Sequence, residues 1–158
     1  MAKNKKDEKP SKLKNKKCEA DGYKFDSQAE RDYYFKCKNE KATGKIIDFE
    51  LQPKFVLQEK FKHHIHGNIR AIIYISDFRI IPLVGEEYIV DVKGNATSDA
   101  KNKRKMFLKK FPQDLIWVVK NKKWGDDGWC EYFKLQKIRR ENRKKKALLK
   151  SKQDQENG

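Results

Sequence analysis

Apolar residues in the first half of the chain follow a helical spacing and then an extended one. Small or apolar side chains recur every four residues, at Ala29, Tyr33 and Cys37. Together with Ser27, a residue that favours helix starts, this spacing predicts a helix over about 27–42. From 45 to 61 the apolar residues are more closely spaced and Pro53 interrupts them, which predicts two short strands or one broken strand.

The second half of the chain alternates between extended and helical patterns. An isoleucine-rich run over 70–82 predicts a strong strand, and Gly85 turns the chain toward another strand over 88–93. A basic helix is predicted over 97–111, followed by a buried strand over 115–119. Because two strands joined through a helix usually lie parallel, the order α-β-β-β-α-β predicts an α/β fold with helices flanking a mixed sheet.

Both ends of the chain differ from its middle. Residues 1–17 contain Leu13 as their only strong hydrophobe, so they bury too little apolar surface to offset the entropy of ordering. We expect a basic disordered arm over 1–21, one domain over 22–133, and a basic tail over 134–158 that includes a partly frayed helix. Aromatic residues before the tail are expected to close the core, with base stacking as the alternative: Trp124, Trp129, Tyr132 and Phe133.

Most of the charge is concentrated at these ends. The 158 residues include 39 Lys or Arg and 23 Asp or Glu, a formal net charge of +16, and 37% are hydrophobic, enough for one modest core. Residues 1–17 carry a net +6 and residues 134–152 a net +9, whereas residues 18–133 carry only +3. Such blocks typically bind a polyanion, because each neutralised phosphate releases condensed counterions. Nucleic acid is therefore the expected partner.

Several classes of protein are not expected from this sequence. It has no run of about eighteen apolar residues and no signal-peptide pattern, which predicts a soluble, cytoplasmic protein. The three cysteines are odd in number and lack a C-x-x-C spacing, which argues against a disulfide framework and a zinc ribbon. Zinc is a minor alternative for His63, His64 and His66, because no fourth ligand has a suitable spacing and the stretch is a predicted hairpin loop.

A carboxylate and an ammonium lie two residues apart in one of the predicted apolar strands. Asp91 and Lys93 point to the same face, since side chains alternate along a strand. A buried strand seldom carries two charges without pairing or function, because burying an unpaired charge is costly. The structural alternative is an Asp91–Lys93 ion pair at the end of a sheet.

A second carboxylate, Asp77, lies in the preceding predicted strand. If the two strands form a hairpin about Gly85, Asp77 lies opposite residues in the low nineties and close to Asp91. Two such carboxylates repel each other unless a divalent cation holds them, and that cation would bind phosphate oxygens and activate a water. The alternative role for Asp77 is an ion pair with Arg79 or Arg70.

Glu30 is a third candidate, for which two roles are open. Ser27-Gln-Ala-Glu30 fits the capping box, in which the glutamate bonds back to the start of its own helix. The other role is a third carboxylate beside the two aspartates. The residue pattern favours neither role.

The helix after the Asp-x-Lys strand is strongly basic. Its cations would grip a phosphate backbone at the rim of a metal site, or they form an ordinary solvated helix face. They are Lys101, Lys103, Arg104, Lys105, Lys109 and Lys110.

These candidates resemble the active-site pattern of the PD-(D/E)XK nuclease superfamily: a helix-borne Glu, an Asp on a strand, and (D/E)-x-K on the next strand. The matching residues are Glu30, Asp77 and Asp91-Val-Lys93. Over about 22–133 the chain is most similar to short phage-type proteins akin to Holliday junction resolvases. The similarity is carried by Phe25-Asp-Ser-Gln-Ala-Glu30, Leu51-Gln-Pro53, Ser76-Asp-Phe78 and Val90-Asp-Val-Lys-Gly94, with Ser76 in place of the proline of the pattern.

The resemblance implies a restriction-endonuclease-like core and Mg²⁺-dependent hydrolysis of phosphodiester bonds in branched DNA, with Mn²⁺ able to substitute. Asp77 and Asp91 would ligate Mg²⁺ together with the Val92 carbonyl. Glu30 would hold a second ion or an outer-shell water, and Lys93 would orient or deprotonate the attacking water. The resemblance also implies a homodimer and, for a phage-encoded protein, the cytoplasm of a bacterial host.

Two other functions fit the same residues. One is a noncatalytic basic DNA-binding protein on a nuclease-like scaffold. The other is a restriction-type or other recombination nuclease on the same core.

Overall fold

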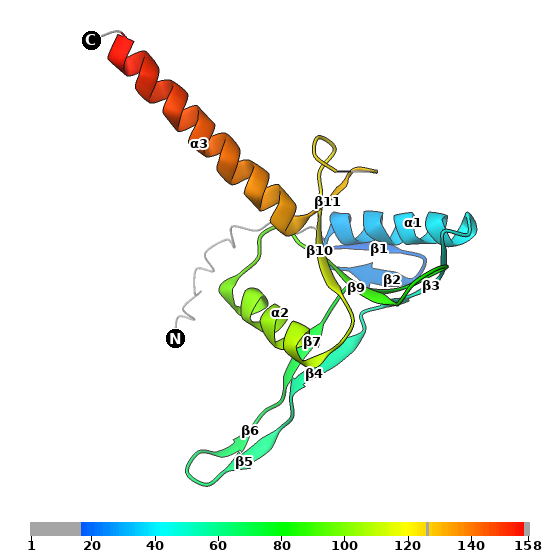
Figure 1. Cartoon of the computed structure of the whole chain (residues 1–158). Coiled ribbons are helices and arrows are strands. Elements are labelled where there is room, and N and C mark those ends of the chain that lie inside the picture. Colours follow the sequence, from blue (N-terminus) through cyan, green and yellow to red (C-terminus); the bar gives the residue numbers. More distant parts are fainter. Residues whose placement is uncertain (1–16, 126, 157–158) are drawn as a thin grey trace, which may run out of the picture.

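The computed structural model describes residues 17–125 and 127–156, with side chains as far as residue 153. Residues 1–16, most of the predicted disordered arm, lie outside this range. Along the chain (Figure 1) the elements are β1 (Cys18–Ala20), β2 (Tyr23–Phe25), α1 (Gln28–Ala42), β3 (Ile46–Leu51), β4 (Lys54–Gln58), β5 (Phe61–His63), β6 (Gly67–Ile69), β7 (Ile72–Ile75), β8 (Phe78–Pro82), β9 (Tyr88–Val92), α2 (Ser98–Lys110), β10 (Leu115–Lys120), β11 (Trp129–Glu131) and α3 (Tyr132–Glu156).

A mixed five-stranded sheet with strand order β11-β10-β9-β8-β3 forms the centre of the molecule. Strands β9 and β10 are parallel, and the other neighbouring pairs are antiparallel. Helix α2 connects the two parallel strands, as predicted for strands joined through a helix. The predicted α/β class with a mixed sheet and flanking helices is therefore confirmed.

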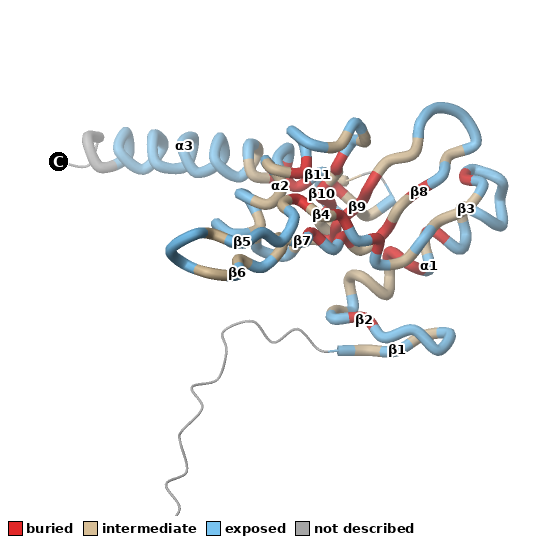
Figure 2. The backbone as a smooth tube through the Cα atoms, turned by 90° about the horizontal axis from the view of Figure 1, so that it is seen from below, coloured by how far each residue is buried: buried red, intermediate tan, exposed pale blue. Residues whose placement is uncertain are grey.

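Each face of this sheet carries its own hydrophobic cluster. On one face Tyr33 and Cys37 of α1 pack with Phe78, and on the other Phe107 of α2 packs with Trp117. Buried residues gather where the two helices meet the central strands (Figure 2). Because β9 is the middle strand, four of its five residues are buried, so a charge on it lies in the interior.

The central sheet ends where two neighbouring chain segments bend at the same level, one between β3 and β4 and the other between β7 and β8. The predicted single strand over 70–82 is wrong: it is divided into β7 and β8 at Ser76 and Asp77. Strand β8 stays in the central sheet, whereas β7 leaves it and pairs with β4. The facing chain is interrupted at Pro53, which has no N–H to continue a ladder. Two backbone hydrogen bonds join the bends, from Gln52 to the Asp77 carbonyl (2.9 Å) and from Ser76 to the Pro53 carbonyl (3.2 Å).

Two elements project from the body of the protein, the β5–β6 hairpin and α3 (Figure 1). The hairpin occupies the place where the sequence predicted a polar turn. Helix α3 is anchored by the buried residues Tyr132 and Leu135, and the side chains over 139–153 are exposed. The predicted frayed helix over 134–152 is thus part of a longer, continuous helix.

The folded part also differs from the prediction at both of its ends. Strand β1 pairs with β2, so the fold includes residues upstream of Gly22, where it was expected to begin. The edge strand β11 was not predicted, because three residues carry too little pattern. Tyr132 is buried and closes the core as expected, whereas Trp124 is 41% exposed and Phe133 38%. No helix in the described part of the chain is long and apolar enough to cross a membrane.

Candidate active site

Asp77 and Asp91 meet at the point where the sheet splits. Strands β8 and β9 pair Phe78 with Val90, and one further step along this antiparallel register brings Asp77 opposite Asp91. The Val92 N–H donates a hydrogen bond to Asp77 Oδ2 at 2.6 Å. The predicted proximity of the two aspartates is therefore confirmed. The β8–β9 register brings them together, and Asp77 itself lies in the bend between β7 and β8 rather than in a strand.

Asp91 is buried and is held by two partners through the same oxygen. Only 2% of the residue is exposed, and Oδ2 lies 2.7 Å from the Lys93 ammonium. The Tyr74 hydroxyl also donates to Oδ2, and it accepts a hydrogen bond from Trp117 Nε1 at 3.0 Å. The Asp91–Lys93 ion pair that was the structural alternative is thus present. It joins a buried carboxylate to an ammonium that remains partly exposed, with 22% of the Lys93 side chain accessible.

Asp77 forms no ion pair with an arginine among the described residues. Arg79 pairs with Glu50 at 3.1 Å and lies 4.0 Å from Glu87, and no ion pair joins Arg70 to Asp77 among the described residues. The arginine alternative for Asp77 is therefore wrong. Burial raises the pKa of the Asp77 carboxyl well above its usual range, and the negative charge of Asp91 raises it further.

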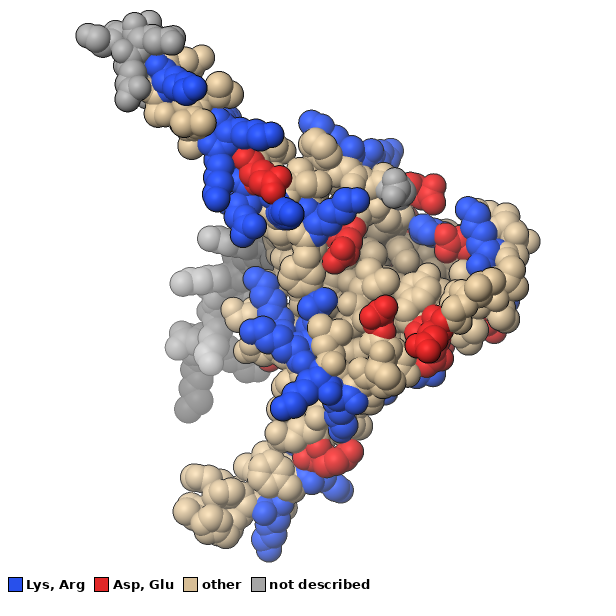
Figure 3. Space-filling view, viewed as in Figure 1, with Lys and Arg blue, Asp and Glu red and all other residues tan. Residues whose placement is uncertain are grey.

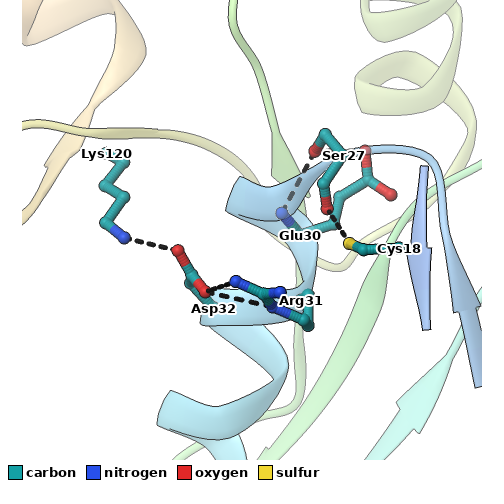
Figure 4. A network of polar contacts seen from close by, with 6 residues as sticks. All are labelled: Cys18, Ser27, Glu30, Arg31, Asp32 and Lys120. Carbon is teal, nitrogen blue, oxygen red and sulfur yellow. Dashed lines mark hydrogen bonds and ion pairs between the residues drawn. The ribbon is translucent and has the colours of Figure 1, made fainter. Parts of the chain in front are cut away.

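Glu30 has the cap contacts and also lies within electrostatic reach of the aspartates. Its carboxylate accepts from the Ser27 hydroxyl (2.9 Å) and from the Asp26 N–H (3.0 Å), while its own N–H donates to Ser27 Oγ (3.1 Å; Figure 4). Burial raises the pKa of Glu30, with a smaller contribution from the charge of Asp91. Glu30 and Asp77 also line one cavity of about 310 Å³. The two roles left open by the sequence are compatible at this residue.

Helix α1 is held by contacts at its start and at Asp32, on both sides of Glu30 in the sequence. Cys18 Sγ donates to the Ser27 carbonyl at 3.3 Å, so strand β1 contacts the start of the helix. Two residues after Glu30, Asp32 pairs with Lys120 of β10 and with Arg31 (Figure 4). The N-terminal end of α1 is thereby held against the central sheet.

The donor atoms at this site suit a hard cation. They are carboxylate oxygens of Asp77 and Asp91, with the Glu30 carboxylate nearby, and oxygen ligands are those that Mg²⁺ prefers. The Ser76 hydroxyl beside Asp77 is fully buried and has no hydrogen-bond partner within the described chain. No group of three or more His, Cys, Asp or Glu among the described residues is arranged to hold a metal. A cation here would therefore depend on the two aspartates completed by carbonyl and water oxygens.

Two members of the site, Tyr74 and Trp117, were not predicted from the sequence. Tyr74 lies in an isoleucine-rich run, and Trp117 lies in an apolar strand where it pairs with Asp91 in the parallel register. The available signal was a polar-tipped aromatic in each apolar run, because a buried Tyr or Trp usually needs a hydrogen-bond partner. Lys93 also lies 5.3 Å from the centre of the Trp117 ring.

The predicted phosphate contacts on α2 fall into two groups. Lys101, Lys105 and Lys109 are exposed and share one face at four-residue spacing. Lys103 pairs with Asp99 at 3.5 Å, and Arg104 lies over the Trp117 and Phe133 rings at 5.6 and 4.6 Å. Lysine and arginine side chains gather over α2 and along α3 on the face shown in Figure 3. Three of the predicted residues are thus directly available to an anion.

The chain belongs to the family described as "Protein of unknown function (DUF1064)", whose model matches residues 10–126. This range includes Glu30, Asp77, Asp91 and Lys93, but ends before α3. No curated protein and no solved structure matches the chain.

Proposed function

We propose that this protein is a Mg²⁺-dependent, structure-selective DNA endonuclease with a restriction-endonuclease-like core. One observation carries the proposal: Asp77, Asp91 and Lys93 converge where the sheet splits, with Glu30 of α1 in electrostatic range. Two close carboxylates in a buried setting destabilise the fold when both are ionised. A divalent cation bound between the two carboxylates would relieve this repulsion. The proposed metal site thus explains why two aspartates lie so close together in a buried position.

The residues of the site have two proposed roles, metal binding and orientation of the attacking water. Asp77, Asp91 and the Val92 carbonyl would hold Mg²⁺ or Mn²⁺, and Glu30 would hold an outer-shell water or a second ion. When bound, the cation would polarise the scissile phosphate and make a bound water more nucleophilic. Lys93, held by Asp91 and partly exposed, would orient that water and offset the negative charge that develops on the phosphate.

The cations outside this centre would bind the DNA backbone. Lys101, Lys105 and Lys109 of α2 have no ion-pair partner in the described part of the chain, and α3 carries a row of exposed lysines and arginines. Each phosphate that they neutralise releases condensed counterions, so binding should weaken steeply with salt. Branched DNA as the substrate and a homodimer as the active form follow from the resemblance to junction resolvases.

A noncatalytic DNA-binding protein is the second candidate, and one observation favours it. Asp91 Oδ2 already has Lys93 and Tyr74 as partners, so part of its charge is balanced without a cation. In that function the acidic site would be only structural, and the basic surface alone would act.

Asp91→Asn and Lys93→Ala separate the two functions. We expect both variants to bind four-way junctions like the wild type and to lose Mg²⁺-dependent cleavage by about 100-fold or more, the size of effect typical of losing one electrostatic contact to the transition state. The matched control is Asp48→Asn with Lys41→Ala, an exposed ion pair with the same 2.7 Å separation, which should leave cleavage unchanged. If the wild type cuts no branched or linear DNA with Mg²⁺ or Mn²⁺, the endonuclease proposal fails.

A further inference from the structure

The β5–β6 hairpin has different chemistry on its two faces. In its antiparallel register Phe61 pairs with Ile69, and Lys62 pairs with Asn68. Because side chains alternate along a strand, the aromatic and apolar positions share one face. Continuing the alternation by one residue puts the polar positions on the other face: Lys60, Lys62, Asn68 and Arg70.

The polar face is cationic and has no internal partner. Lys60, Lys62 and Arg70 are exposed, and none of them forms an ion pair among the residues that the structure describes. The sequence contains no Asp or Glu between Glu59 and Asp77. These three cations and Asn68 line a surface hollow of about 470 Å³, together with Phe61, Ile69 and Ala71. A ligand for this face would therefore be an anion with hydrogen-bonding groups, as a nucleotide is.

The other face and the turn expose rings and an aliphatic side chain. Phe61 is 47% exposed and Ile65, in the turn, is 71% exposed. The His63 ring stacks with those of His64 and His66, at centroid distances of 4.5 and 4.9 Å. Exposed rings beside cations are typical of surfaces that bind unstacked bases, because every base has a face that can stack.

The turn is held in one conformation by its own hydrogen bonds. His63 Nδ1 accepts from the N–H groups of Ile65 and His66, each at 3.2 Å. A ligand that contacts the hairpin would thus meet a turn whose backbone N–H groups are already bonded within the turn.

The hairpin is connected directly to the candidate active site. Strand β6 leads into β7, which carries Tyr74 and ends at the bend that contains Asp77. Strand β4 leads into β5 and pairs with β7. The β5–β6 hairpin is therefore an extension of the paired strands β4 and β7. A nucleotide bound at the hairpin would thus be held at a set distance from the candidate site.

We infer that the β5–β6 hairpin is a second nucleic-acid contact, which binds an unstacked nucleotide where duplex stacking is broken. The cations of the polar face bind its phosphates, and the Phe61 ring stacks on its base. This inference rests on the proposed function and deepens it, because it assigns branch selectivity to a named surface. Continuous duplex has no unstacked base to offer, so it gains nothing from the Phe61 contact.

Phe61→Ala tests the inference, with Phe35→Ala as the matched control. Phe35 lies on α1 and is 46% exposed, nearly the same as Phe61. Binding of the full-length protein is measured with Ca²⁺ in place of Mg²⁺, on a four-way junction with 2-aminopurine at the branch point and on a linear duplex of equal length. We expect Phe61→Ala to bind the junction about tenfold more weakly and to lose the 2-aminopurine signal. Binding to the linear duplex should not change.

Further variants separate stacking from charge. Phe61→Trp should retain junction binding, because it keeps an aromatic face. Replacing Lys60, Lys62 and Arg70 together by Gln should make the salt dependence shallower by about 0.7–0.9 per lost phosphate contact. Phe35→Ala should behave as the wild type in every measurement.

The inference is overturned if Phe61→Ala binds the junction as the wild type does, or loses affinity equally for junction and duplex. It is also overturned if the main effect is a change of molecular mass in solution, which would make the hairpin a contact between copies. A wild type that binds junctions through Phe61 but never cleaves them would refute the endonuclease and leave the hairpin contact standing. If the wild type cleaves junctions and Phe61→Ala changes neither binding nor cleavage, the endonuclease proposal stands and the hairpin contact is refuted.

Discussion

Replacing Tyr74 by phenylalanine removes one oxygen from the interior of the candidate site and leaves the ring in place. That hydroxyl donates to Asp91 and accepts from Trp117 Nε1 at 3.0 Å, and all three residues are buried. The substitution therefore breaks two hydrogen bonds. It also leaves the Trp117 N–H without an acceptor in the described part of the protein.

The size of the effect follows from these contacts. A hydrogen bond to a charged group contributes about 1.5–3 kcal/mol, and a buried donor left unsatisfied costs about 1–3 kcal/mol. The two contributions overlap, so we expect the free energy of unfolding to fall by about 3 kcal/mol. For a chain of this length that corresponds to a Tm lower by about 6–12 °C. If Asp91 is a metal ligand, losing its partner should also weaken Mg²⁺ binding by about 10–100-fold.

Tyr33→Phe is the matched control for these measurements. Tyr33 is as buried as Tyr74, 6% against 4% exposed, but it lies on the opposite face of the sheet and its hydroxyl has no hydrogen bond among the described residues. The free energy of unfolding of the Tyr33→Phe variant should differ from that of the wild type by about 1 kcal/mol or less. Urea denaturation and thermal melting report the stability of both variants, and a Mg²⁺ titration of single-turnover cleavage reports the metal dependence.

The reasoning would be refuted if Tyr74→Phe and Tyr33→Phe melted at the same temperature. That result would mean that the buried Asp91–Tyr74–Trp117 contacts contribute nothing to the fold. A Tyr74 variant that is destabilised but needs no more Mg²⁺ than the wild type would keep the structural network and reject its role in holding a metal ligand.

Three further predictions follow from the site, the basic helix and one close backbone approach. Because the folded-state pKa of Asp77 is raised, the neutral carboxyl stabilises the fold below the unfolded pKa of about 3.9, and this contribution is lost as pH rises through the folded pKa. Asp77→Asn should therefore melt at a higher temperature than the wild type at pH 8 and at nearly the same temperature at pH 4; a lower Tm at pH 8 would contradict the repulsion. Ending the chain after Ile138 removes only exposed side chains from the described range 139–153, so Tm should not change, whereas the salt dependence of DNA binding should become shallower by about 0.9 per lost phosphate contact. An unchanged salt slope would show that α3 does not touch DNA. A Cβ on Gly125 would lie 2.1 Å from the Trp129 carbonyl oxygen, so Gly125→Ala should destabilise the protein by about 1–3 kcal/mol in urea denaturation, and Gly94→Ala, with nothing within 4 Å, should be tolerated.

Basic and acidic groups lie in different parts of the structure. The exposed cations of α3 extend away from the sheet, while the acidic residues Asp77 and Asp91 lie at its centre. Attraction between a polyanion and the basic surface is long-ranged and depends on salt, whereas the buried carboxylates act only at contact. In the proposed function, a backbone bound by the basic surface would meet this acidic centre, where a bound cation would offset the repulsion.

Local pattern was sufficient for most of the secondary structure. Ser27 caps α1, and Thr97 caps α2, as their residue types indicate. The parallel pair β9–β10 followed from a helix between two apolar runs. The error over 70–82 has a specific cause: Ser76 and Asp77 interrupt the strand through bonds to Gln52 and Pro53 of the facing chain, and such long-range contacts have no local signal.

For the candidate site, the sequence by itself determined the residue types and their approximate register. Asp91 and Lys93 share a face because strands alternate, and Asp77 comes opposite Asp91 because the β8–β9 hairpin turns near Gly85. The burial of Asp91, its contact with Tyr74 and the double role of Glu30 depend on residues that are far apart in the chain. Those were decided only by the tertiary structure, because the desolvation and the hydrogen bonds that tune a carboxylate come from whichever elements pack against it.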